Sequence, residues 1–219
     1  MIEDLFGEYG AETVQTYMLA IQKNAENAVR NHLKKIGKLH PEPLTAVDQL
    51  DDGTEIHLKI TIDTERGDAV FDFDGTMPQS KGNYNAPPSL TRSAIIYVLR
   101  CIINEDIPLN QGCLAPIDIR VPEGSIIAPS SGAAVYSGNS STSSRLTDVI
   151  LKAFQHCAAS QGTMNGIQMY GGLKAKPGEK FAGYMFMYGE TICGGSGAGP
   201  TWNGVSAIHT VSPYETTCC

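Results

Sequence analysis

The sequence lacks the features that would mark a membrane protein, a secreted protein or a nucleic-acid-binding protein. No stretch approaches the roughly eighteen consecutive apolar residues that a membrane helix needs. The first residues, Met1 to Phe6, have neither the basic flank nor the apolar core of a secretion signal. Positive charge is scarce, because 16 lysines and arginines stand against 23 aspartates and glutamates, and no basic face is visible. We therefore expect a cytoplasmic protein with neither a membrane nor a nucleic acid as partner.

The spacing of cysteine and histidine gives no sign of a metal site. No two cysteines form a Cys-x-x-Cys pair, and no histidine lies at a zinc spacing from any of them. We expect all six to be reduced thiols: Cys101, Cys113, Cys157, Cys193, Cys218 and Cys219. Cys113 is interpreted as a small buried hydrophobe, because the sequence places no histidine to activate it.

What the sequence does have is a glycine-rich stretch, residues 190–204, called the glycine loop below. It holds five glycines, one proline and the only tryptophan. It fits neither a nucleophile elbow, because Ala198 stands where that motif needs glycine, nor a phosphate loop, because it contains no lysine. Glycine is favoured where the backbone takes a positive φ or approaches another group closely. Contact with a ligand and a tight structural turn both remain open.

Apolar periodicity predicts the fold class. Helical stripes cover residues 11–36, which Gly37 is expected to close, then 89–103 and a segment from 146 onward. Alternation predicts strands at 56–62, 69–73, 117–121 and 184–188, the first two as a hairpin and the last buried on both faces. Residues 38–54 are interpreted as a connection. We expect a mixed α/β fold in which three amphipathic helices pack on mixed sheet, with polar and glycine-rich loops at the strand ends.

Two polar clusters precede helices and allow two interpretations each. The first contains Asp72, Asp74, Asn83 and Asn85, whose side chains either make turn hydrogen bonds or form the wall of a polar pocket. The second runs from Ser137 to Arg145. Its hydroxyls either cap the following helix, with Asp148 in its first turns, or form an anion site with Arg145 at the helix N-terminus.

These clusters, in their order along the chain, resemble the hydantoinase B/5-oxoprolinase family. The resemblance covers about residues 8–210, is strongest to the eukaryotic 5-oxoprolinases, and rests on these segments: 14–18, 71–76, 82–87, 106–114, Gly138 to Arg145, Ser160 to Asn165, and 190–200. Three departures stand out. Asp74 and Gly166 replace a serine and an asparagine usual in the family, residues 211–219 diverge, and the upstream aspartate and histidine motifs that bind metal in related carboxylases are absent.

The resemblance implies ATP-dependent opening of 5-oxo-L-proline to L-glutamate, a hydrolase reaction of glutathione metabolism. It also implies that ATP, with magnesium, is held by a separate ATPase module of the hydantoinase A type. This chain, residues 1–219, then corresponds to part of the hydrolytic module and acts on a small-molecule substrate. A homo-oligomer is compatible with the sequence. The alternatives are a non-catalytic fragment that serves as a folding or interaction module, and a hydantoinase or ketone carboxylase.

Within that resemblance, Glu190 and Asp72 are the candidate catalytic residues. Glu190 is the candidate general base, because a carboxylate at the end of a buried strand can have a raised pKa. The candidate substrate-binding residues are Asn83, Asn85, Asn139, Arg145, Asn165, Gly194, Gly195, Gly197 and Gly199. The backbone amides from Gly194 to Gly199 are expected to stabilise an oxyanion. No metal ligands are predicted.

Overall fold

The computed structural model describes residues 2–103, 105, 107, 110–158, 166–172 and 185–208. The chain divides into two compact units, one from Met1 to His156 and the other from Cys157 to Thr217. The helices and strands are α1 (Ile2–Tyr9), α2 (Ala11–Leu39), β1 (Leu44–Gln49), β2 (Glu55–Asp63), β3 (Asp68–Asp72), α3 (Pro88–Ile102), η1 (Gln111–Leu114), β4 (Ile117–Arg120), η2 (Tyr136–Asn139), α4 (Ser141–Ala153), β5 (Gly166–Gly172) and β6 (Met185–Thr191).

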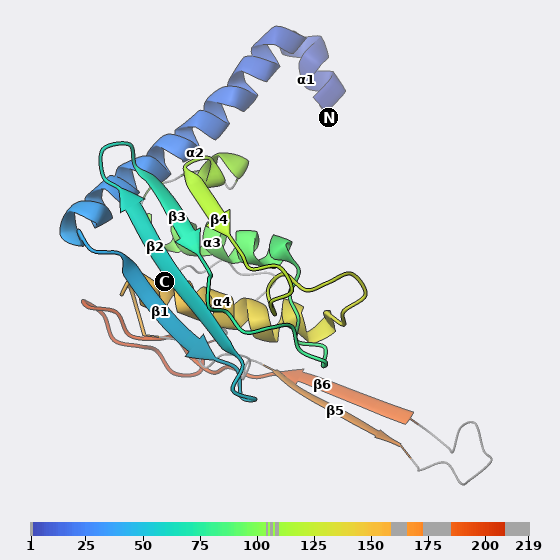
Figure 1. Cartoon of the computed structure of the whole chain (residues 1–219). Coiled ribbons are helices and arrows are strands. Elements are labelled where there is room, and N and C mark those ends of the chain that lie inside the picture. Colours follow the sequence, from blue (N-terminus) through green and yellow to red (C-terminus); the bar gives the residue numbers. More distant parts are fainter. Residues whose placement is uncertain are drawn as a thin grey trace. The chain divides into compact units, whose positions relative to one another are not determined.

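The first unit is built on a four-stranded mixed sheet in the order β1-β2-β3-β4 (Figure 1). β1, β2 and β3 are antiparallel neighbours, and β4 joins β3 in parallel. The predicted α/β class, the hairpin of β2 and β3, and the helices at 11–36 and 89–103 are therefore confirmed. Treating residues 38–54 as a connection is wrong, because Leu44–Gln49 pairs with β2 as an edge strand.

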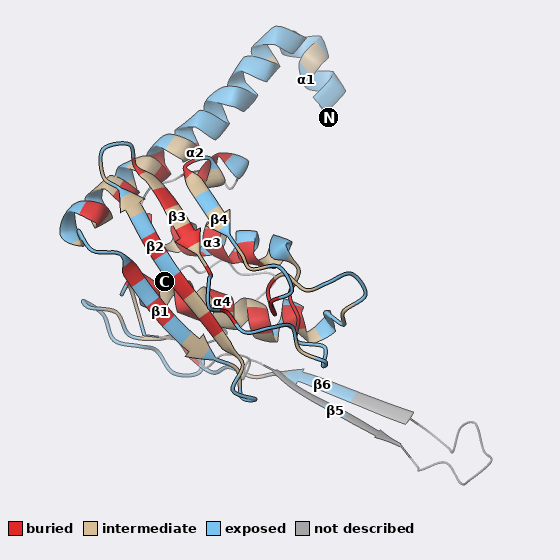
Figure 2. Cartoon of the chain, in the orientation of Figure 1, coloured by how far each residue is buried: buried red, intermediate tan, exposed pale blue. Residues whose placement is uncertain are grey.

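A single core lies between the sheet and the helices α2, α3 and α4 (Figure 2). Alternate residues of β2 point into it, so Ile56, Leu58 and Ile60 are buried while Lys59 and Thr61 are exposed. Phe71 of β3 is fully buried, and its ring lies 6.1 Å from that of Phe154. Cys113 is buried as well, as its interpretation as a small hydrophobe requires.

Helix α2 continues past its predicted end at Gly37 and stops at Leu39. Gly37 does not close the helix; it lets the helix approach the sheet, because a Cβ there would lie 2.6 Å from Thr64 Cγ2. Arg30 ties the same helix to the β2–β3 hairpin, since its Nη1 donates to Asp68 Oδ1 at 2.5 Å. The helix and the hairpin are thus held together by close packing and by an ion pair.

The second unit contains the hairpin of β5 and β6 and the glycine loop that follows β6. The prediction that this strand is buried on both faces is wrong for its described residues, because Tyr188, Gly189 and Glu190 are exposed. Its alternation of aromatic residues and methionine is equally compatible with a hairpin whose faces are both open. Across the described ranges, every helix is too short or too polar to cross a membrane.

The first unit should lose stability when the pH falls below neutrality, because it buries His32 as a neutral imidazole. His32 Nε2 is buried and has no hydrogen-bond partner among the described residues. Burial lowers the pKa of His32, the nearby charges of Lys35 and His156 lower it further, and Glu105 opposes them. Burial also lowers the pKa of His156. The unfolded chain, with histidine pKa values near 6.5, therefore binds more protons as the pH falls through that value.

We expect the free energy of unfolding to fall between pH 7 and pH 5 (roughly the interval around an ordinary histidine pKa), and the fall to be smaller in His32→Gln. Urea denaturation at both pH values measures it. His40→Gln, at the end of the same helix, is the matched control and should lose as much stability as the unsubstituted chain. Equal losses in all three proteins would show that His32 is not the group responsible.

Candidate functional site

Two polar segments that are far apart in the sequence lie against each other in the first unit. They are residues 80–87 and 134–142, and together they are called the loop junction. The amide of Ser137 donates to the carbonyl of Asn83 at 2.9 Å, and the hydroxyl of Thr142 donates to the carbonyl of Tyr84. The two asparagines of the first predicted polar cluster and the start of the second cluster are thus brought together.

Asn85 holds the loop junction together from inside. Its side chain is fully buried, and Oδ1 accepts from the amide of Ser80 at 2.7 Å. Nδ2 donates to the carbonyls of Ser80, Gly82 and Ala134, at 2.9, 3.1 and 3.0 Å. Main-chain groups therefore occupy the amide of Asn85, and in a binding site it would act by positioning the loop.

Gly138 allows the two segments to come this close. A Cβ at this position in η2 would lie 2.0 Å from the carbonyl oxygen of Asn85. The glycine is therefore required by close backbone approach and not by a positive φ. Helix α3 begins at Pro88 and α4 at Ser141, so the positive ends of two helix dipoles lie next to the junction.

Of the candidate side chains in the loop junction, those of Asn83 and Asn139 are exposed. Both residues use their main-chain carbonyls within the junction: Asn83 accepts from Ser137, and Asn139 accepts from Ser143 Oγ at 2.6 Å. Their positions are consequently fixed while their amide side chains face solvent. Of the candidate residues in the junction, these two have side chains that a ligand can reach.

The serine cluster belongs to helix α4 and does not cap it. The helix begins at Ser141, and its N-cap residue, Ser140, makes no side-chain cap hydrogen bond. The hydroxyls of Ser143 and Ser144 instead donate one turn back, to Asn139 and Ser140. The capping prediction is therefore wrong, and so is the placement of Asp148 in the first turns, because Asp148 is the eighth residue of the helix.

Arg145 links α4 to the edge of the sheet. Its Nη1 lies 3.2 Å from Asp48 Oδ2 of β1 and 3.8 Å from Asp148 Oδ2. Asp148 is only 2% exposed, so the guanidinium compensates a buried carboxylate. Arg145 Nε is buried without a partner among the described residues. An arginine shared by two carboxylates is a weaker anion ligand than the sequence suggests.

Asp72 ends β3 and points away from the helices. Its neighbours in the sequence, Phe71 and Phe73, are fully buried on the core side, so alternation places Asp72 on the other face. There its register partners are Lys59 and Arg120. Asp72 Oδ1 accepts from the amide of Asp74 at 3.1 Å, and no hydrogen bond within the described residues joins it to the loop junction.

In the second unit, the glycine loop folds back on itself. The amides of Gly195, Ser196 and Gly199 donate to the carbonyls of Ile208, Val205 and Trp202, at 3.0, 2.9 and 3.1 Å. A Cβ on Gly197 would lie 2.0 Å from the Ala158 carbonyl oxygen, and one on Gly199 would lie 2.2 Å from the Trp202 ring. Tight turning explains these glycines.

Three other main-chain amides of the glycine loop do not take part in these turns. Among the described residues, the amides of Gly194, Gly197 and Ala198 donate to no carbonyl. Gly197 and Ala198 are consecutive, and consecutive amides can form a concave anion-binding arrangement. Of the predicted oxyanion donors, which run from Gly194 to Gly199, these three therefore have amides without a carbonyl partner among the described residues.

Glu190 stands at the end of β6, just before the glycine loop. Its Oε2 accepts from the Tyr188 hydroxyl at 2.5 Å, and this hydrogen bond raises the pKa of Tyr188. The burial that made Glu190 the candidate base is not observed, because its side chain is exposed. The remaining candidate, Asn165, lies outside the described residues, as does the rest of 159–165.

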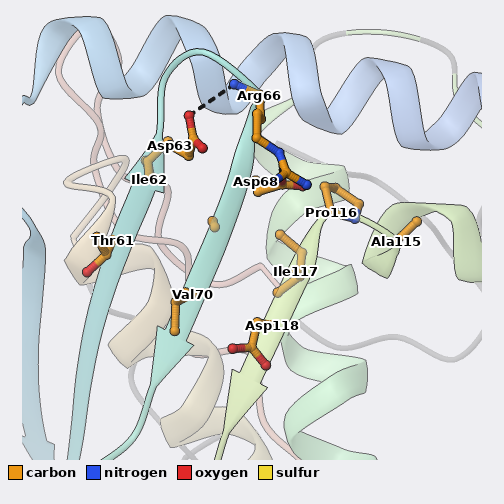
Figure 3. A pocket seen from close by; sticks show the side chains of 11 residues that line it. Thr61, Ile62, Asp63, Arg66, Asp68, Val70, Ala115, Pro116, Ile117 and Asp118 are labelled. Atoms are coloured by element: carbon orange, nitrogen blue, oxygen red, sulfur yellow. Dashed lines mark hydrogen bonds and ion pairs between the residues drawn. The ribbon is translucent and has the colours of Figure 1, made fainter.

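A shallow cavity of about 590 Å³ lies over the sheet near the β2–β3 turn (Figure 3). None of the predicted site residues lines it. Its charged groups are already engaged: Asp63 Oδ1 accepts from the Arg66 amide at 3.0 Å, and Arg66 Nε lies 2.8 Å from Asp68 Oδ2. Within the described ranges, no three His, Cys, Asp or Glu side chains gather as a metal site would require.

The residues that sequence reasoning did not select are those that join the two segments of the loop junction, Gly138 and Thr142. Both occur in the quoted family motifs, and neither was a candidate site residue. Thr142 is fully buried, although it lies in a serine-rich stretch that suggests solvent exposure. A glycine three residues before a helix start is the signal that could have revealed the close approach.

The chain is similar in sequence to one protein family and to several enzymes of that family. The sequence profile described as hydantoinase B/oxoprolinase matches residues 1–217. The chain is 49% identical to 5-oxoprolinase 1 of Arabidopsis thaliana, over 95% of this chain and 16% of that protein. It is 47% identical to the 5-oxoprolinase of Saccharomyces cerevisiae, over 93% of this chain and 16% of that protein. The chain thus spans about a sixth of the length of these relatives.

Among solved structures, the ATP-dependent caprolactamase of Pseudomonas jessenii has the same fold. It superposes with a TM-score of 0.69 and 15% sequence identity, over 94% of this chain and 36% of that one. At this identity the comparison shows the fold alone. The sequence relatives carry the information about function.

Proposed function

This chain belongs to the hydantoinase B/oxoprolinase family, and from that premise we propose that it is part of the hydrolytic module of an ATP-dependent cyclic amide hydrolase that opens 5-oxo-L-proline to L-glutamate. The observation that carries the proposal is the identity of 49% and 47% to two named 5-oxoprolinases along nearly the whole chain.

The glycine loop does not fit ATP: it has no lysine, and three of its amides already bond to carbonyls of the same unit. On the family resemblance, nucleotide and magnesium would be held by a separate module, of the hydantoinase A type. What this chain would contribute is binding and hydrolysis of the cyclic amide.

The proposed hydrolysis requires hydrogen-bond donors for a developing oxyanion and a general base, and the chain has a candidate for each. Once ATP has phosphorylated the carbonyl oxygen of the lactam, water would add to the carbonyl carbon, the C–N bond would break as the nitrogen takes up a proton, and a second water would release phosphate from the resulting acyl phosphate. Unengaged amides such as those of Gly197 and Ala198 would stabilise the negative charge on oxygen in these additions. A carboxylate must accept the proton of the first water, and Glu190 would do so, oriented by Tyr188. Asn83 and Asn139, whose exposed side chains lie in the first unit, stay predicted substrate ligands on the family resemblance.

A second candidate function is a non-catalytic folding or interaction module. The engagement of Asn85 and Arg145 in structural contacts favours it. This observation concerns the chain by itself, so the two functions are separated by an assay with and without the rest of the enzyme.

The assay measures phosphate released from ATP in the presence and absence of 5-oxo-L-proline. We expect no substrate-dependent release from the purified chain alone. Release should appear when the chain is mixed with S. cerevisiae 5-oxoprolinase lacking the matching segment. The same truncated enzyme without this chain is the control. If sedimentation shows that the two proteins bind but the mixture releases no phosphate in response to 5-oxo-L-proline, the non-catalytic module is favoured.

A further inference from the structure

An apolar stripe on the N-terminal half of α2 is open to solvent. Met18 and Ile21 are 50% and 46% exposed, and Tyr17 beside them is 67% exposed. At helical spacing they continue the line of Ala25, Val29 and Leu33, which is buried in the core. Figure 2 shows the change along the helix, exposed in its first half and buried farther on. Val14, Tyr17, Met18 and Ile21 are called the α2 stripe below.

The chemistry of this half-helix is unlike that of a solvated surface. Between Gly10 and Ala25 the only charged residues are Glu12 and Lys23. Helix α1 adds exposed apolar side chains at Ile2, Leu5 and Tyr9, which are 58%, 41% and 55% exposed. A helix that is meant to face water usually carries charge on its exposed side, and contiguous apolar surface marks an interaction site.

Comparison with the longer relatives indicates which polypeptide can cover the α2 stripe. The match to the A. thaliana enzyme leaves out 5% of this chain, about 11 of 219 residues, so almost all of α2 lies within the matched segment. The same segment is 16% of that protein, which therefore holds about five times as much polypeptide outside it. A long relative thus contains both a counterpart of this helix and ample chain to bury it.

We propose that the α2 stripe is the docking surface for the remaining part of a hydantoinase B/oxoprolinase-type polypeptide, which presents an apolar, uncharged groove to it. The proposal rests on family membership and not on the proposed catalytic function. A groove of that kind complements a stripe without charge, whereas a charged or nucleic-acid partner would not. Burial of Tyr17, Met18 and Ile21 would extend the core stripe of α2 without a break.

The test compares one charge on the stripe with the same charge on the opposite side. Met18→Glu places it on the stripe. Leu19→Glu is the matched control, because a rotation of about 200° around the helix separates Leu19 from both Tyr17 and Ile21, and Leu19 is an apolar side chain that is 67% exposed. Since both sites are open in the isolated chain, neither variant should change its melting temperature or solubility.

The two variants should differ once the chain is part of the longer enzyme. In S. cerevisiae 5-oxoprolinase whose matching segment is exchanged for this chain, Met18→Glu should lower the apparent melting temperature by about 2–4 °C, and Leu19→Glu should not. Mixing the isolated chain with the enzyme lacking that segment gives a second measurement, in which Met18→Glu should weaken binding at least about tenfold. Equal behaviour of the two variants in both measurements would overturn the proposal.

A second copy of this chain is the competing occupant. Sedimentation of the isolated chain should show a monomer, and a dimer that Met18→Glu dissociates would overturn the proposal in favour of self-association. Melting and binding are read without ATP or 5-oxoproline. An assembled but inactive protein would therefore contradict the proposed function alone, while loss of the difference between Met18→Glu and Leu19→Glu would contradict the docking surface alone.

Discussion

Replacing Asn85 with alanine should lower the free energy of unfolding of the first unit by about 2–4 kcal/mol. The side chain is fully buried and makes four hydrogen bonds to main-chain groups. Its removal leaves the Ser80 amide without an acceptor and three carbonyls short of a donor. All four bonds are partly buried, so the loss exceeds that of a surface hydrogen bond.

Urea denaturation measures the effect, with Asn83→Ala as the matched control. Asn83 lies two residues away in the same loop, but its side chain is exposed, and its bond to Ser137 uses the main chain. That control should change stability by less than about 0.5 kcal/mol. If both variants unfold at the same urea concentration, the loop junction is not held by Asn85.

Gly138→Ala should be at least as damaging, with an expected loss of about 3 kcal/mol or more. The added methyl would lie 2.0 Å from the Asn85 oxygen and 2.7 Å from its carbonyl carbon, both main-chain atoms that no rotamer change can move away. The junction must open to accept it, which breaks the bond from Ser137 to Asn83.

Gly7→Ala is the control for the general effect of replacing glycine. Nothing lies within 4 Å of a Cβ at Gly7, which is inside α1, so that variant should be neutral or more stable by up to about 1 kcal/mol. Hydrogen exchange should show faster exchange at the Ser137 amide only in Gly138→Ala. Unchanged protection there would mean that the two segments do not need this contact.

The elements that the sequence predicts well are those whose periodicity is long and regular. Residues 56–62 alternate so strictly that the strand is unambiguous, and the stripe of α2 runs over many turns. β1 was missed because its inward residues, Leu44 and Ala46, give too short an apolar pattern beside Asp48. Gly37 was misinterpreted because a glycine near a helix end can serve either closure or close packing, and only the partner element decides between them.

The candidate site is harder to predict from the sequence than the fold is, for a physical reason. Sequence identifies which residues are polar, but not whether their hydrogen-bonding capacity is already used. Asn83 and Asn85 are the same residue type two positions apart, yet one faces solvent and the other is buried among main-chain groups. Likewise, the serines of α4 suggest capping, although the helix begins within them and their hydroxyls turn back on it.

The central claim is that this chain works as part of a hydrolytic module, with Glu190 as the base. It is tested most directly by 5-oxoproline-dependent ATP hydrolysis of the S. cerevisiae enzyme whose matching segment is replaced by this chain. We predict turnover within about tenfold of the parent and a loss of at least about 100-fold in Glu190→Gln. A folded exchange protein without activity, or normal turnover in Glu190→Gln, would contradict the account.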